Sequence, residues 1–162
     1  MKTCLVGCGG IAAVHGSVLT SDIDTEFVAA ADIKPEKAQT YAENFHTKPY
    51  PSLESMLEAE KPDVLHICTP HYLHVPMAIY SLERNINVFM EKPPAISFDQ
   101  LEELKKAAAK SDAQLGFCYQ NRYNASIRAA KDLIDSGKAG KVLGARAFVT
   151  WCRGAAYYTE SG

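Results

Sequence analysis

The sequence predicts an α/β fold in which helices cover both faces of a parallel sheet, and three observations lead to this prediction. Short apolar runs alternate with helical patterns through the first 120 of the 162 residues, as in successive βαβ units. The runs are continuous, which is typical of strands buried on both faces. Glycines follow the first run, and an acidic residue closes the second. We therefore expect a doubly wound sheet.

Apolar runs mark the expected strands, and cap residues mark the expected helices. The strands are expected at residues 3–6, 27–31, 48–50, 63–68, 87–90 and 113–119. The helices between them are expected at residues 11–19, 35–45, 52–59, 72–84 and 97–110. Pro35 fits the first turn of its helix, and Ser52 and Ser97 fit N-cap positions. Because proline is tolerated only in edge strands, Pro49 indicates that residues 48–50 lie at a sheet edge.

The pattern changes after the sixth strand. Asn121 or Asn124 is expected to cap a helix that runs to Ser136 and stops at Gly137, a residue that favours helix ends. Residues 141–151 are expected to form one long strand, which needs partner strands. Such an exposed strand is a predicted association edge.

Composition excludes several classes of protein. Hydrophobic residues make up 47% and charged residues 22% of the chain, as in ordinary globular proteins. The formal net charge of -2 offers no footprint for nucleic acid, and no apolar run is long enough to span a membrane. The N-terminus has no signal-peptide pattern. Five scattered cysteines without a CxxC pair indicate free, mostly buried thiols, so a cytoplasmic protein is expected.

A glycine-rich loop follows the first strand. Residues 7–12 match the pattern G-x-G-x-x-A, and Asp32 lies 20 residues beyond Ala12, the spacing of a ribose-binding carboxylate. Gly7 permits the tight turn, while Gly9 lets the backbone approach a pyrophosphate at the helix start. A tight turn without a ligand is the alternative. The residues expected to bind a dinucleotide here are Gly7, Gly9, Gly10, Ile11 and Asp32.

Asp32 also bears on which dinucleotide binds. Its carboxylate can accept hydrogen bonds from both ribose hydroxyls and would repel a 2′-phosphate. Ile33 follows it, and Lys34 is the only nearby cation. We therefore expect NAD rather than NADP.

Ligands of doubly wound sheets gather at the carboxyl ends of the strands. After the fourth strand, Thr69 and Pro70 are expected to border the cofactor groove. His71 and His74 have the spacing of a metal pair, but no third ligand matches, so no metal site is expected. His74 is expected to hydrogen-bond the cofactor or the local backbone.

The fifth strand ends in Glu91-Lys92-Pro93-Pro94. Lys92 is either a surface lysine before a rigid turn or a cation held over a substrate. In the second case it orients a substrate hydroxyl and takes part in proton transfer if desolvation lowers its pKa. Glu91 and Lys92 are accordingly expected at the cofactor site. Gln120, after the sixth strand, is expected to reach the nicotinamide end, whereas Arg122 serves either there or in an ion pair.

The remaining histidines are expected to have structural roles. His15 lies on the first helix and His66 within a strand, and both are expected to be hydrogen-bonded in the interior. His46 is expected at the surface.

These motifs together resemble the glucose–fructose oxidoreductase, inositol 2-dehydrogenase and MocA (Gfo/Idh/MocA) family. The matching motifs are the glycine loop with His15, then Asp32, then Cys68-Thr69-Pro70 with His74, and Glu91-Lys92-Pro93. The glycine loop is generic, but the combination of Thr-Pro…His with Glu-Lys-Pro is specific. His71 departs from the pattern, since the family often has Asn there.

The resemblance implies a Rossmann-type fold and an NAD(P)-dependent oxidoreductase that acts on a sugar, a polyol or a similar small alcohol or ketone. It implies that Lys92 is the catalytic lysine and that the bond before Pro93 is cis. Residues 1–120 would be the nucleotide-binding domain. Residues 121–162 would hold the linker helix and first strand of a truncated α+β domain for substrate and oligomer contacts.

Further expectations follow from the resemblance, and two alternatives stay open. Members carry Asp and His in the second domain, and no such motif is present here, so this fragment is expected to bind nucleotide without turnover. The full-length protein is expected to be a homo-oligomer. One alternative is a regulator of the same family that binds NAD without chemistry. The other is a methyltransferase, which also uses a glycine loop and an acid after the second strand.

Overall fold

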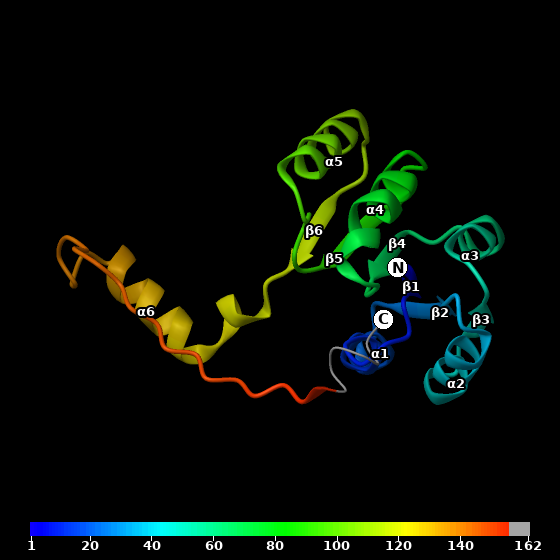
Figure 1. Cartoon of the computed structure of the whole chain (residues 1–162), viewed down its shortest axis with the longest axis horizontal. Coiled ribbons are helices and arrows are strands. Elements are labelled where there is room, and N and C mark those ends of the chain that lie inside the picture. The colour runs from blue at the N-terminus through cyan, green and yellow to red at the C-terminus, as the bar shows by residue number, and fades with distance from the viewer. Residues whose placement is uncertain (156–162) are drawn as a thin grey trace. The chain divides into compact units, whose positions relative to one another are not determined.

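The computed structural model describes residues 1–155, and the chain divides into two compact units, Met1–Cys118 and a second unit that begins at Tyr119 (Figure 1). The strands are β1 (Lys2–Val6), β2 (Glu26–Ala31), β3 (Lys48–Tyr50), β4 (Val64–Ile67), β5 (Asn87–Glu91) and β6 (Leu115–Cys118). The α-helices are α1 (Ala12–Ser21), α2 (Pro35–Phe45), α3 (Leu53–Glu60), α4 (His74–Leu82), α5 (Phe98–Lys110) and α6 (Ala125–Asp135). Short 3-10 helices are η1 (His71–Leu73) and η2 (Gln120–Tyr123).

The strands form one parallel sheet in the order β3-β2-β1-β4-β5-β6. This is the Rossmann-type doubly wound sheet that the sequence predicts, with each strand within two residues of its expected bounds. The strand order reverses between β1 and β4, and ligands bind doubly wound sheets at this point. Lys48-Pro49-Tyr50 lies at the edge beside β2, as expected for a strand containing proline.

Two apolar layers hold the helices on the sheet. Alternate residues of each strand point to opposite faces, so Leu5 and Ala30 pack with α1 and α2 on one face. Cys4, Ala29 and Leu65 pack with α3, α4 and α5 on the other.

Helix α1 approaches α2 closely because Gly16 has no side chain. A Cβ atom at Gly16 would lie 2.5 Å from the Tyr41 hydroxyl oxygen and 2.7 Å from Cζ of Phe45. The same Tyr41 hydroxyl donates a hydrogen bond to the Ala12 carbonyl at 2.7 Å. Glycine at this position therefore fixes how α1 lies over the sheet.

The caps expected at Ser52 and Ser97 form, whereas Asn124 occupies the N-cap position of α6 without a side-chain capping bond. One helix start also differs from the prediction. The Ser52 and Ser97 side chains accept the backbone N–H of Ser55 and of Gln100, respectively, as N-caps do. The helix predicted at residues 72–84 begins instead with the 3-10 turn His71–Leu73, and α4 starts at His74.

The second unit contains α6, which the sequence places correctly. It follows Asn124 and ends before Gly137, whose φ is 72°. The long strand predicted at residues 141–151 was wrong: these residues have no regular secondary structure. A strand needs a hydrogen-bonded neighbour, and no strand in the described part of the chain pairs with this segment.

All five cysteines are free, as expected, but fewer are buried than predicted. Cys4 and Cys68 are buried, Cys8 and Cys118 are half-buried, and Cys152 is exposed. Among the described residues, no helix combines the length and the apolar character needed to cross a membrane.

Candidate functional site

The glycine loop between β1 and α1 needs glycine at Gly7 for reasons within the chain itself. Gly7 has a φ of 92°, and a Cβ there would lie 2.7 Å from both the Cys68 carbonyl carbon and the Thr69 nitrogen. The Gly7 N–H also donates to the Ala31 carbonyl at 2.8 Å. The loop therefore passes tightly between the ends of β2 and β4.

Gly9 and Gly10 differ from Gly7, because the chain around them leaves open space. A Cβ at either position would meet nothing within 4 Å, and both residues are exposed. Open space beside amides that precede a helix is what a bound pyrophosphate requires. Ile11, which follows, is 38% exposed at the start of α1.

Asp32 lies against the glycine loop. One carboxylate oxygen accepts the Cys8 N–H and the other accepts the Lys34 N–H, each at 2.9 Å. A carboxylate oxygen has room for more than one hydrogen bond, so Asp32 can still accept ribose hydroxyls. Together with the open space at Gly9, this arrangement fits a dinucleotide.

His74 links the loops that follow β4 and β5. Its ring is fully buried, with Nε2 at 2.9 Å from the Thr69 carbonyl and Nδ1 at 2.9 Å from the Pro93 carbonyl. Because carbonyls only accept hydrogen bonds, both contacts form together when both ring nitrogens carry protons. His74 therefore bonds to the local backbone, one of the two alternatives from the sequence.

His71 is exposed beside His74, with the ring centroids 5.6 Å apart. Partial burial lowers the pKa of His71, and the nearby positive groups His74 and Lys92 lower it further. A lowered pKa favours the neutral form of His71, and the buried Glu91 carboxyl opposes this shift.

Glu91 is the last residue of β5 and Lys92 follows it, and the two residues differ in burial. Glu91 is only 4% exposed, whereas Lys92 is exposed. One Glu91 oxygen lies 3.1 Å from Nε2 of His15, and the other accepts the Lys92 backbone N–H at 3.2 Å. The Lys92–Pro93 peptide bond is cis, as the resemblance implied.

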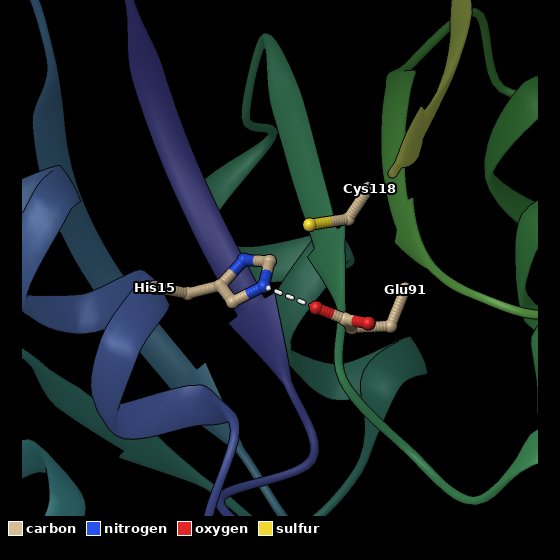
Figure 2. Close-up of side chains that lie close together, drawn as sticks. All are labelled: His15, Glu91 and Cys118. Atoms are coloured by element: carbon tan, nitrogen blue, oxygen red, sulfur yellow. Dashed lines mark hydrogen bonds and ion pairs between the residues drawn. The ribbon is translucent and has the colours of Figure 1, made fainter. Parts of the chain in front are cut away.

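Figure 2 shows the contact that sequence reasoning missed: His15 of α1 points at Glu91 of β5, with Cys118 of β6 beside them. The sequence predicts a structural role for His15, and no local pattern in it indicates the contact with Glu91. Ligating atoms of His15, Glu91 and Cys118 lie within 4.8 Å of one another, so this group can be considered for a metal ion. His15 and Glu91 already bond to each other, and the absence of a metal site stays a prediction.

Direct contacts connect several of the predicted site residues at the carboxyl ends of the strands. Asp32 bonds to the glycine loop, the loop packs on Thr69, and His74 bonds to both Thr69 and Pro93. Pro70, which follows Thr69, begins the turn that leads into η1. Gln120 is exposed in η2 and belongs to the second unit, so its predicted part at the nicotinamide end stays a prediction.

The comparison with protein families gives one match, and it covers the first unit. Residues 1–119 match the model of the Gfo/Idh/MocA family, described as "Oxidoreductase family, NAD-binding Rossmann fold". The fold and the site at its switch point define an NAD-binding Rossmann protein. The chain belongs to the Gfo/Idh/MocA oxidoreductase family.

Individual relatives agree with the family. The D-glucoside 3-dehydrogenase of Escherichia coli is 28% identical over 144 residues, covering 88% of this chain and 41% of that protein. The 2,7-anhydro-N-acetylneuraminate hydratase of Mediterraneibacter gnavus is 31% identical over 146 residues, covering 88% and 38%. The WlbA dehydrogenase of Bordetella pertussis, solved with NADH and UDP-GlcNAcA, has a TM-score of 0.83 at 31% identity, covering 86% and 43%. The chain thus spans less than half the length of these relatives.

Proposed function

We propose that this chain is the nucleotide-binding part of an NAD-dependent oxidoreductase that acts on a hydroxyl group of a sugar or polyol. The observation that carries the proposal is the position of Lys92. This exposed residue directly follows the buried Glu91, at the carboxyl ends of the strands, where the glycine loop also lies. A lysine with only a solvating role needs no such buried neighbour.

The nicotinamide ring, when bound, supplies the hydride acceptor or donor. The chain's own residues bind and orient. Gly9 and Gly10 leave room for the pyrophosphate at the start of α1, and Asp32 accepts ribose hydroxyls. The Glu91 carboxylate accepts a hydrogen bond from the Lys92 backbone N–H. In this proposal the Lys92 side chain reaches the substrate hydroxyl, orients its oxygen and takes part in the transfer of the hydroxyl proton.

Lys92 is exposed within this chain, so any desolvation that lowers its pKa must come from other groups. We assign it to the bound nucleotide and to a substrate-binding domain, because the relatives are more than twice as long as this chain. The 162 residues alone are therefore expected to bind nucleotide without turnover.

We propose NAD rather than NADP as the cofactor, since the Asp32 carboxylate faces the loop where a 2′-phosphate would meet it. We propose a sugar or polyol substrate because two of the three relatives named above are a glucoside dehydrogenase and a dehydrogenase solved with a nucleotide sugar. Cytoplasmic localisation and a homo-oligomeric full-length protein also stay proposals.

The test replaces Lys92 by Ala in the complete gene product and measures NADH binding and polyol or sugar oxidation. We expect turnover to fall at least about a hundredfold, the usual size of a lost general acid–base group, while NADH binding is retained. Equal turnover in both proteins would contradict the role of Lys92. Bound NADH with no turnover on any sugar or polyol in either protein would favour the non-catalytic regulator instead.

A further inference from the structure

We propose that His15 is a positioning residue for Lys92, acting through the Glu91 carboxylate. This inference rests on the proposed function, because it takes Lys92 as the catalytic group. It adds to the site a residue that is distant in sequence: His15 and Glu91 are 76 positions apart.

The contacts form one continuous series from His66 of β4 through His15 of α1 and Glu91 to Lys92. Nδ1 of His66 lies 2.9 Å from Nδ1 of His15, and Nε2 of His15 lies 3.1 Å from Oε1 of Glu91. Oε2 of Glu91 accepts the backbone N–H of Lys92 at 3.2 Å. Figure 2 shows the contact between His15 and Glu91 as a dashed line.

Proton positions in the series are set by its members. A carboxylate only accepts, so with Glu91 as a carboxylate the N–H at Nε2 of His15 is the donor of this hydrogen bond. Burial, and then the neighbouring His15, lower the pKa of His66 to about 4, so His66 is neutral at physiological pH. Neutral His66 can donate to or accept from Nδ1 of His15, and in both cases the bond to Glu91 is kept.

Glu91 needs this donor because it is buried. Only 4% of the residue and 7% of His15 are exposed, so water cannot replace the lost bond. A buried carboxylate without its partner is costly and turns toward solvent. That movement would release the Lys92 N–H, which is the group that ties Lys92 to the end of β5.

Two packing features hold His15 in reach of Glu91. Gly16, the next residue, lets α1 lie close to α2, and the Phe89 ring packs beside both His15 and His66, with centroids 6.0 and 5.1 Å apart. These contacts restrict the His15 ring, so it meets Glu91 already oriented.

The experiment measures how tightly the 162-residue chain and three variants bind NADH and ADP-ribose, which lacks the nicotinamide. His15→Phe removes the donor. His15→Gln restores an N–H donor near the Nε2 position. Leu19→Ala, on the same helix and also buried, is the control for lost stability. Calorimetry gives both dissociation constants, and NMR follows the Lys92 amide signal and its hydrogen exchange.

In His15→Phe we expect NADH to bind about tenfold more weakly relative to ADP-ribose, the effect of one charge-assisted hydrogen bond. The Lys92 amide signal should move and its exchange should accelerate. His15→Gln should recover both readouts, and Leu19→Ala should leave both as in the parent chain.

An unchanged Lys92 amide in His15→Phe, or the same changes in Leu19→Ala, would overturn the inference. If the parent chain binds no NADH, the proposed function fails, while the Lys92 amide still decides whether His15 positions this residue. The two failures are therefore distinguishable.

Discussion

The carboxylate of Asp32 accepts the backbone N–H of Cys8 at 2.9 Å, so the acid that follows β2 is bonded to the glycine loop that follows β1. The second carboxylate oxygen is held by the Lys34 N–H at the same distance. We propose that a charge fixed in this way faces the ribose and favours a hydroxyl there over a phosphate.

Replacing Asp32 by Asn is expected to shift the preference toward NADP. The ratio of the NADPH to the NADH dissociation constant should fall about tenfold, because the charge that repels a 2′-phosphate and attracts the ribose hydroxyls is gone. Calorimetric titration with both nucleotides measures the ratio. Glu58→Gln, which removes an equal charge from an exposed position on α3, should leave it unchanged. An unaltered ratio in Asp32→Asn would place the ribose away from this carboxylate.

Alanine at two glycines of one loop should affect stability to very different extents. Gly7→Ala puts a methyl 2.7 Å from backbone atoms of Cys68 and Thr69 at a positive φ, so unfolding free energy should fall by about 3 kcal/mol. Gly9→Ala meets nothing and should change it by less than about 0.5 kcal/mol. Urea unfolding followed by circular dichroism measures both.

Nucleotide binding provides a second test of Gly9. Gly9→Ala should weaken NADH about tenfold or more, because the methyl fills the space proposed for the pyrophosphate. Normal NADH affinity in this variant would show that the pyrophosphate does not approach Gly9.

Gly16→Ala is expected to destabilise the chain although alanine favours helices by about 1 kcal/mol. The new methyl would overlap the Tyr41 hydroxyl and the Phe45 ring, at a cost of about 1–3 kcal/mol. Tyr41→Phe, which removes the nearest of these atoms, should recover part of the loss. Gly144→Ala, where a Cβ meets nothing within 4 Å, is the matched control. A gain in stability from Gly16→Ala would contradict the close packing of α1 on α2.

Acid should destabilise the chain by protonating Glu60, which bonds to Lys48 and Tyr50 of the edge strand β3. Hydrogen bonds from the Tyr50 hydroxyl at 2.6 Å and from Lys48 at 2.9 Å, together with Lys2, lower the pKa of this buried carboxyl from 4.5 to about 2. A lowered folded-state pKa means that the stabilisation is complete above pH 4.5 and is lost as the pH falls toward 2.

Urea midpoints measured from pH 6 down to about pH 3 test this dependence. The Glu60→Gln variant should be less stable at pH 6 and should lose less stability on acidification. Equal slopes in the two proteins would assign the acid sensitivity to other carboxyls.

Much of the fold can be predicted from the sequence because its signals are local. Continuous apolar runs predict the strands, and the serines at positions 52 and 97 predict helix starts that the side-chain bonds confirm. Asp32 and Gly7 could be found from the spacing of the loop, since a tight turn and a ribose carboxylate demand those residue types.

The missed features depend on contacts that no local pattern encodes. His15 of α1 and Glu91 of β5 are 76 positions apart and meet only in the folded chain, and Gly16 allows α1 to lie close to α2. The segment at residues 141–151 has the alternation of a strand, but hydrogen bonds to a neighbouring strand decide whether one forms, and the described chain offers no such neighbour.

The most direct test of the central claim is a calorimetric titration of the 162-residue chain with NADH, repeated with Gly9→Ala. If the glycine loop binds the pyrophosphate, we expect saturable one-to-one binding to the parent chain and a loss of about tenfold or more in affinity for the variant. Absence of saturable binding to a folded parent chain, or equal affinity in the two proteins, would contradict it.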